Sequence, residues 1–227
     1  MNPFLCRHCL SPTMYLAETT LNKNLEQYKL DVENFDLYYI KNWLDDDLRL
    51  QVKDLIDKHA FPSTITTQGS TKESDFRTSS TYYFNFNPHN RDYIELQRRI
   101  TETMGIPEEY SEPLQGVKYE VGEYFKEHTD FFDRRSPNFE IFAHGENQRT
   151  WTFMVYLNDV EEGGHTLFPQ IKLQFKPVAG SALIWNNLWP DGKENYWTSH
   201  EALPPVSGQK FIATQWYRMK PYRNEGS

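Results

Sequence analysis

A chain of 227 residues is long enough for one domain with a buried core, and its 15% aromatic content suits a β-rich fold. Its 32 acidic and 24 basic side chains give a net charge of -8, which disfavours binding to nucleic acids or anionic membranes, because both need a cationic surface. The sequence contains no run of about 18 apolar residues, so no transmembrane helix is expected. The N-terminus lacks the pattern of a secretory signal. Both cysteines, Cys6 and Cys9, lie near the start, so a reducing, cytoplasmic location is expected.

The first 30 residues are expected to form an appendage, followed by one domain over residues 31–220 and a short tail over residues 221–227. The appendage contains residues 6–9 (CRHC), which have the spacing of half a zinc site. A structural zinc site needs four ligands, and the sequence has no second Cys-x-x-Cys. The favoured interpretation is therefore a reduced pair of cysteines on a tail.

Helical and extended patterns follow one another in the first half of the domain. Residues 37–43 alternate loosely and predict a strand, and residues 45–59 show apolar positions at helical spacing behind a first turn of acids. A stretch rich in serine and threonine, residues 63–81, predicts a loop with extended pieces. Residues 93–104 predict a second helix, which ends at Gly105.

After residue 115 the sequence changes to short strands separated by Gly and Pro turns. Alternation and apolar runs predict strands around residues 117–121, 151–157, 181–185 and 211–217, with a tight turn at Gly163-Gly164. Many short strands at this spacing favour a sandwich or jelly roll, with the two helices packed on the outside. The predicted class is mainly β with flanking helices.

The second half of the chain contains a candidate metal site. His128 and Asp130 are two residues apart, so on an extended segment their side chains point to the same face, as two ligands of one ion require. His200 is the favoured third ligand, because it stands shortly before a strong strand. Two imidazoles and one carboxylate suit Fe(II), although Zn(II) or Mn(II) would bind the same atoms. Alone, a His-x-Asp pair is usually just solvated, and the chain has a near-copy at residues 144–146.

Lys210 opens the last predicted strand, where a lysine is ordinarily a solvated charge. By parity it shares one face with Ile212 and Trp216. If that face is inward, the buried ammonium needs an anion, and the carboxylate of a ligand is the natural partner. Tyr119 and Thr152, on other strands, offer hydroxyls to the same anion, although each is more often a core residue whose hydroxyl is satisfied locally.

The second half of the chain resembles the 2-oxoglutarate- and Fe(II)-dependent dioxygenases, and specifically their prolyl 4-hydroxylase branch. The resembling stretches are VKYEVGEYFKEHTDFF (117–132), QRTWTFMVYLNDVEEGGHTLFP (148–169), PVAGSALIW (177–185) and SHEALPPVSGQKFIATQWYR (199–218). The order of these stretches and the ten-residue spacing from His200 to Lys210 make the resemblance specific. It is strong from about residue 115 to 220, weaker from 36 to 110, and absent before residue 30.

The resemblance implies a double-stranded β-helix, that is, a jelly-roll core. The implied site residues are His128, Asp130 and His200 as iron ligands, Lys210 as the partner of the distal carboxylate of 2-oxoglutarate, Tyr119 and Thr152 as lining of the co-substrate pocket, and Trp216 near the substrate side. For Trp216, core packing is an equally good interpretation. One departure is Phe125, which stands where relatives commonly have a tyrosine three residues before the metal histidine. Tyr124 cannot substitute for it, because adjacent strand residues face opposite sides.

The activity implied by the resemblance is hydroxylation of a prolyl residue in a peptide or protein, with succinate and CO2 as co-products and ascorbate restoring oxidised iron. The nearest alternative is the same chemistry on a different side chain or a small molecule. A nucleic-acid demethylase is disfavoured by the acidic balance of the chain. A β-domain that only binds a ligand or partner is the third alternative, and the complete set of His128, Asp130, His200 and Lys210 argues against it.

Overall fold

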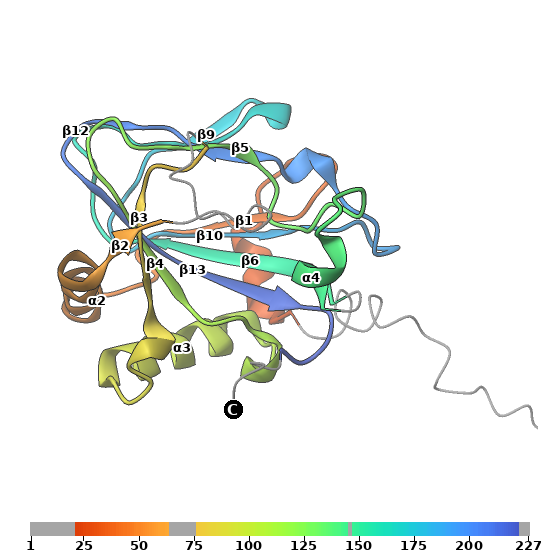
Figure 1. Cartoon of the computed structure of the whole chain (residues 1–227), viewed down its shortest axis with the longest axis horizontal. Helices are drawn as coiled ribbons and strands as arrows, with labels where there is room; N and C mark the ends of the chain where they lie inside the picture. Colours follow the sequence, from red (N-terminus) through yellow and green to blue (C-terminus); the bar gives the residue numbers. More distant parts are fainter. Residues whose placement is uncertain (1–20, 64–75, 145–146, 223–227) are drawn as a thin grey trace, which may run out of the picture.

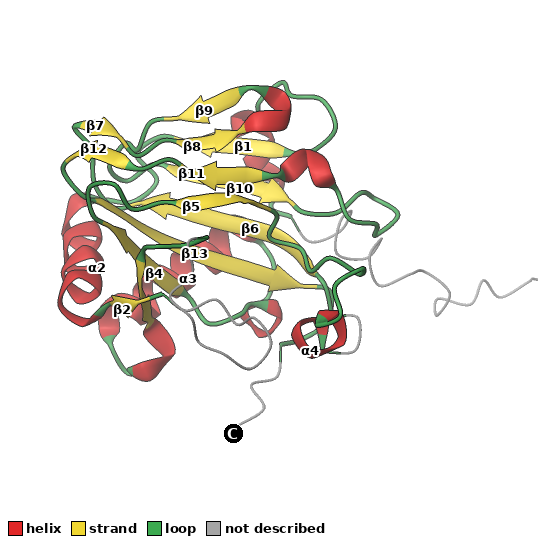
Figure 2. Cartoon of the chain, turned by 45° about the horizontal axis from the view of Figure 1, so that its top comes forward, coloured by secondary structure: helices red, strands yellow, loops and turns green. Residues whose placement is uncertain are grey.

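The computed structural model describes residues 21–63, 76–144 and 147–222, which form two main antiparallel β-sheets with helices on one side (Figure 1). The larger sheet contains, in spatial order, β1 (Leu37–Ile40), β10 (Ala182–Asn186), β6 (Arg149–Tyr156), β13 (Lys210–Arg218), β4 (Gln115–Tyr119), β3 (Ser80–Tyr83) and β2 (Phe61–Pro62). The smaller sheet contains β5 (Phe125–His128), β11 (His200–Ala202), β8 (Thr166–Phe168) and β9 (Leu173–Phe175). Figure 2 shows the smaller sheet as a layer over the larger one, with the short pair β7 (Glu162–Gly163) and β12 (Pro205–Ser207) at one end.

Two helices cover the outer face of the larger sheet. Helix α2 (Asp46–His59) begins after Asp45, whose side chain accepts a hydrogen bond from the backbone N–H of Leu48 at 3.1 Å. Helix α3 (Arg91–Met104) begins after Asn90, which caps it in the same way, and ends at Gly105 in the left-handed conformation. The shorter helical segments are α4 (Phe139–Ala143) and the 3-10 turns η1 (Lys23–Tyr28), η2 (Phe84–Phe86), η3 (Glu108–Tyr110), η4 (Pro169–Ile171) and η5 (Tyr196–Thr198).

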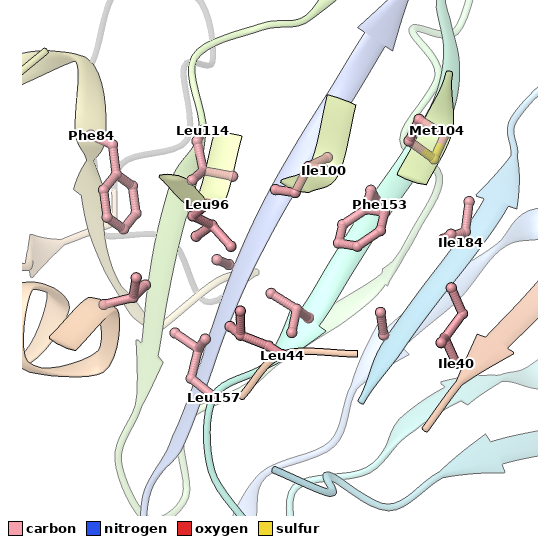
Figure 3. Close-up of a cluster of buried hydrophobic side chains, with 14 of the residues drawn as sticks. Ile40, Leu44, Phe84, Leu96, Ile100, Met104, Leu114, Phe153, Leu157 and Ile184 are labelled. Carbon is pink, nitrogen blue, oxygen red and sulfur yellow. The ribbon is translucent and has the colours of Figure 1, made fainter. Parts of the chain in front are cut away.

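Each central strand of the larger sheet divides its side chains between two hydrophobic clusters. The first cluster lies between this sheet and the helices, where Ile100 and Met104 of α3 stand over Phe153 of β6 (Figure 3). The second cluster lies between the two sheets and receives Met154 and Tyr156 from the same strand. The period of two in β6 therefore separates a helix-covered face from a face that looks toward the smaller sheet.

The predicted class, mainly β with flanking helices and a jelly-roll core, is confirmed. The predicted helices at 45–59 and 93–104 are present as α2 and α3, and α3 starts two residues early because Asn90 caps it. The strand predicted over 37–43 ends at Ile40, because Asn42 has a positive φ of 52°, which is incompatible with an extended strand. Most of the predicted loop at 63–81 lies outside the described residues.

The end of the predicted appendage packs on the domain. Leu25 of η1 is only 3% exposed in the first cluster, and the backbone N–H of Asn22 donates to the carbonyl of Met104 at 2.8 Å. Residues 6–9, with the two cysteines, lie outside the described part of the chain, and the division at residues 30 and 220 stays a prediction. Among the described helices, none has the length and apolar character that crossing a lipid bilayer requires.

Candidate metal centre

The side chains of His128, Asp130 and His200 meet at the open edge between the two sheets. His128 ends β5, His200 begins β11, and the two residues are directly paired across these strands. Asp130 lies just after β5, with its carboxylate oxygens 3.9 Å from Nε2 of His128 and 3.8 Å from Nε2 of His200. One ligand atom from each residue lies within 4.8 Å of the others. Over residues 21–63, 76–144 and 147–222, no other group of three or more His, Cys, Asp and Glu side chains converges in this way.

Both imidazoles are oriented by backbone carbonyls. Nδ1 of His128 lies 2.8 Å from the carbonyl of Lys126, and Nδ1 of His200 lies 2.9 Å from the carbonyl of Thr198. A carbonyl can only accept, so each Nδ1 carries the proton and donates it. The lone pair of each Nε2 is therefore left facing Asp130, which is the tautomer that a metal ligand requires.

Asp130 is held by a hydrogen-bond chain that reaches the larger sheet. The hydroxyl of Thr152 on β6 donates to Oδ2 of Asp130 at 2.7 Å, and the side-chain amide of Asn187 donates to that hydroxyl at 3.0 Å. Asp130 and Thr152 are both buried. This chain fixes the carboxylate with one oxygen toward each histidine.

The protonation states of these groups suit a divalent cation. Burial, reinforced by the neighbouring His200, lowers the pKa of His128 to about 3, so its imidazole is neutral. Burial alone would raise the pKa of Asp130, but the adjacent imidazoles and Arg149 hold it below its ordinary value. A neutral imidazole beside an ionised carboxylate is the state in which such side chains bind metal.

A buried ammonium lies in the same pocket. Lys210 begins β13, is 1% exposed, and lines a cavity together with all three candidate ligands. Its Nζ lies 3.4 Å from the hydroxyl of Thr166, and no carboxylate of the described chain pairs with it. Burial lowers the pKa of Lys210 to about 7. A buried cation without a counter-charge is costly unless an anion binds beside it.

Hydroxyl and aromatic groups surround this ammonium. The hydroxyl of Tyr156 donates to Thr166 at 2.8 Å, and the ring centres of Tyr119 and Tyr156 lie 5.2 Å and 5.8 Å from the Nζ of Lys210. Tyr119 is paired with Lys210 across β4 and β13. These residues make one end of the cavity both cationic and rich in hydroxyls, which suits a carboxylate.

The cavity opens into a groove of about 620 Å³. Trp216 lines both spaces, and the guanidinium of Arg149 lies 4.1 Å from its ring centre. Arg149 also makes two hydrogen bonds to the carboxylate of Glu112, at 2.6 Å and 2.7 Å. Arg77 lines the cavity and the groove as well, and it donates to the hydroxyls of Ser79 and Thr81, which leaves it without a carboxylate partner in the described chain.

The structure brings most of the residues singled out from the sequence into this pocket. His128, Asp130, His200, Lys210, Tyr119 and Trp216 all line the cavity. Thr152 does not, because its hydroxyl contacts Asp130 instead of the surroundings of Lys210. The hydroxyl near Lys210 belongs to Thr166, and the sequence signal for it was the threonine that follows the Gly163-Gly164 turn. Arg77, which also lines the cavity, lies where the resemblance is weaker and was not predicted as a site residue.

Comparisons with known proteins agree with this geometry. The sequence model described as the 2OG-Fe(II) oxygenase superfamily matches residues 114–218, which include all six of the cavity-lining residues named above. The match covers 105 of the 227 residues, and over this part the chain is similar to the superfamily. These residues form the smaller sheet and the central strands of the larger one.

The curated proteins that the chain resembles are named as prolyl 4-hydroxylases. The chain is 30% identical over 192 residues to "Probable prolyl 4-hydroxylase 3" of Arabidopsis thaliana, covering 74% of this chain and 64% of that protein. It is 34% identical over 122 residues to prolyl 4-hydroxylase subunit alpha-1 of Gallus gallus, covering 53% of this chain and 23% of that subunit. The chain thus spans less than two thirds of the length of these curated relatives.

Solved structures give the same fold. The viral collagen prolyl hydroxylase of Paramecium Bursaria Chlorella virus-1, solved in complex with 2OG, has a TM-score of 0.61 and 27% identity, over 80% of this chain and 95% of that one. A Pseudomonas putida prolyl-4-hydroxylase has a TM-score of 0.54 at 16% identity, over 80% of this chain and 92% of that one, which shows the shared fold alone.

Proposed function

We propose that this chain is an Fe(II)- and 2-oxoglutarate-dependent dioxygenase that hydroxylates a prolyl residue in a peptide or protein. The observation that carries the proposal is one cavity with two different binding ends. At one end, two imidazoles and a carboxylate converge within 4.8 Å, and at the other a buried ammonium has no carboxylate partner in the described chain. A metal ion fits the first end, and a ligand with a carboxylate fits the second.

His128, Asp130 and His200 are the proposed iron ligands. Their donor set is two imidazole nitrogens and one carboxylate oxygen, which suits Fe(II) and leaves coordination positions for other ligands. The carbonyls behind both Nδ1 atoms and the hydroxyl of Thr152 on Asp130 hold these donors in position. Thr152 supports the metal end of the cavity through Asp130.

Lys210 is the proposed partner of the distal carboxylate of 2-oxoglutarate, with Tyr119 and Thr166 beside it. The ammonium and the hydroxyl of Thr166 supply donors at the closed end of the cavity. An anion bound there would favour the charged form of Lys210, whose pKa burial otherwise lowers to about 7. Binding of the co-substrate would give the Lys210 ammonium a counter-charge that no carboxylate of the described residues provides.

The chain's own part in the reaction is orientation and exclusion of water. When bound, iron and 2-oxoglutarate supply the oxidising chemistry, in which O2 is consumed, succinate and CO2 are released and one oxygen atom enters a C–H bond of the substrate. Asp130 remains ionised and His128 neutral, so neither acts as the acid or base of a proton transfer. The apolar walls from Val117, Met154 and Ile212 keep the cavity dry between its two polar ends.

A peptide containing proline is the proposed substrate, and the groove beside the cavity is its proposed binding site. The groove has aromatic walls from Phe76, Tyr83 and Trp216, which suit the flat face of a proline in an extended chain, and Arg77, which suits a peptide carbonyl. Named relatives are prolyl hydroxylases, which also favours this substrate. The same chemistry on a different side chain or small molecule is the alternative. Ascorbate is the proposed reductant for iron oxidised in unproductive turnovers.

An anaerobic titration followed by exposure to O2 tests the proposal. Fe(II) and 2-oxoglutarate are added to the metal-free chain, O2 is admitted, and succinate is measured with and without proline-containing peptides, which are then examined by mass spectrometry for one added oxygen. We expect succinate from the unchanged chain, and none above background from His200→Ala, which removes one of three ligands. His89→Ala, at an exposed position in a loop, serves as the matched control and keeps the activity.

Two results would contradict different parts of the proposal. No succinate from the unchanged chain, even uncoupled from any peptide, would exclude the dioxygenase activity. Succinate that rises with another class of substrate, while proline peptides stay unmodified, would keep the cofactors and exclude the prolyl target.

A further inference from the structure

Strand β5 contains an irregularity that changes the direction of Phe125. Phe125 and His128 are three residues apart, so in a regular strand their side chains would point to opposite faces. On the neighbouring strand β11 their partners are Ala202 and His200, which are only two residues apart. One extra residue of β5 is therefore accommodated between these pairs, which is a β-bulge. The bulge brings Phe125 and His128 to the same side of the sheet.

The two rings stack on each other. The ring centres of Phe125 and His128 are 3.6 Å apart, with an angle of 15° between the planes. The guanidinium carbon of Arg77 lies 4.9 Å from the centre of the Phe125 ring. The ring of Phe76 also packs on Phe125, with its centre at 5.7 Å and its plane at 83°. Arg77, Phe125 and His128 all lie at the boundary between the cavity and the groove.

The two histidines are supported differently. His200 is 6% exposed and has Trp185 and Phe168 around it, with ring centres at 4.9 Å and 5.5 Å, besides its Nδ1 hydrogen bond. His128 is less buried, and its Nδ1 hydrogen bond, like that of His200, goes to a carbonyl two residues away in the chain. One hydrogen bond fixes one atom of a ring but leaves the plane free to tilt about it. Within the described chain, Phe125 is the only side chain other than His200 whose ring stacks or packs against His128.

We propose that Phe125 is a positioning residue that fixes the plane of the His128 imidazole and thereby raises the affinity of the site for its divalent metal. The proposal rests on the proposed function in taking His128 as a ligand. Groups that orient a ligand from behind typically change metal affinity about 10- to 100-fold when they are removed. Phe125 lines the cavity and the groove, and its proposed effect on the metal is through the ring of His128.

Metal binding by three variants tests this role without requiring turnover. The metal-free proteins are titrated with Co(II), and the dissociation constant is measured by calorimetry, together with the visible absorption of the bound Co(II) and the thermal unfolding midpoint of the metal-free protein. Phe125→Leu removes the flat ring, Phe125→Tyr keeps it, and Phe175→Leu makes the same change at another half-buried phenylalanine of the smaller sheet that contacts no candidate ligand.

We expect Phe125→Leu to bind Co(II) about tenfold more weakly and with an altered absorption spectrum, while its unfolding midpoint matches that of Phe175→Leu. Phe125→Tyr should restore both the affinity and the spectrum. Unchanged affinity in Phe125→Leu, or an equal loss in Phe175→Leu, would overturn the proposal. If the unchanged chain itself bound no Co(II), the proposed metal site would fail first, so the two failures are distinguishable.

Discussion

The two faces of strand β13 have opposite characters. Phe211, Ala213 and Tyr217 face the helices and join the first hydrophobic cluster. Lys210, Ile212 and Trp216 line the cavity. The helix-covered face is apolar and closely packed, whereas the cavity face contains the buried ammonium of Lys210.

The helix-covered face contributes mainly to the stability of the fold, whereas the cavity face contains the groups that would bind a ligand. On the helix side, β4 approaches α2 so closely that Gly116 has no room for a side chain next to Ile56. On the cavity side, the neighbouring residues of β4 and β13 leave a space and place polar groups around it. Substitutions on the two sides should therefore change different measurements, stability on one and ligand affinity on the other.

We expect the cavity-side variant Lys210→Met to show the largest effect, which is a loss of affinity for 2-oxoglutarate. Removing one partner of a buried charge pair costs about 2–5 kcal/mol, so the affinity for 2-oxoglutarate should fall about 30-fold or more. Without the co-substrate, the variant should resist urea better than the unchanged chain, because an unpaired buried ammonium is replaced by an apolar side chain. Calorimetry with Fe(II) under anaerobic conditions and urea unfolding measure the two quantities.

Lys118→Met is the matched control for that change. Lys118 lies on β4 beside Tyr119 but on the opposite face, where it pairs with Asp57 of α2 at 2.7 Å. Its loss should leave the affinity for 2-oxoglutarate unchanged. Equal losses in Lys118→Met and Lys210→Met would show that the two faces are not separate.

A smaller effect is expected on the helix side, in Gly116→Ala. The added Cβ would lie 2.6 Å from Cδ1 of Ile56 and closer still to its Cγ1, so the strand or the helix must shift. Overpacking of this kind costs about 1–3 kcal/mol of unfolding free energy, measured by urea unfolding, with the affinity for 2-oxoglutarate unchanged. Adding Ile56→Ala opens space for the new methyl group, so the double variant should be more stable than the sum of the two single changes predicts. Strict additivity would contradict the close contact.

The smallest expected effect is a pH dependence that belongs to the cavity face alone. The pKa of Lys210 is lowered by burial from 10.5 to about 7. Between these values the unfolded chain holds a proton that the folded, ligand-free chain lacks, so stability rises with pH across this range and falls as the pH drops toward 7. Binding of a carboxylate needs the charged ammonium, so above about pH 7 binding takes up a proton and the affinity falls by up to about tenfold per pH unit. Calorimetry at several pH values measures this, and Lys210→Met should abolish the dependence.

Sequence reasoning predicted that Lys210, Ile212 and Trp216 share one face of β13, because alternation is a property of the strand itself. Even numbers of positions separate Lys210, Ile212 and Trp216 along the strand. If the side chain of one of them points inward, all three do. Strict alternation would place Phe125 and His128 on opposite faces, but a β-bulge shifts the period by one residue and leaves no mark in a single sequence. The stacked pair was therefore not foreseen.

Other parts of the site depend on contacts between distant segments. Thr152 was expected at the anion end of the cavity, but its hydroxyl reaches Asp130, which depends on how the turn after β5 folds back on β6. Arg77 reaches the cavity because residues 76–78 pair with the free edge of β5, and their sequence contains no strand pattern that predicts this. Leu25 was assigned to an appendage because its neighbours are polar, yet it fills a place in the core.

The pairing of His128 with His200 across β5 and β11 also has a consequence for folding. The two histidines lie far apart in the chain, so the donor set exists only after long-range strand pairing, which is the slow kind of step in β-rich proteins. Because the unfolded chain offers no such donor set, a metal ion binds the native state selectively. Binding therefore shifts the folding equilibrium toward the native state. Metal added during refolding would then be retained only by chains whose smaller sheet has already formed.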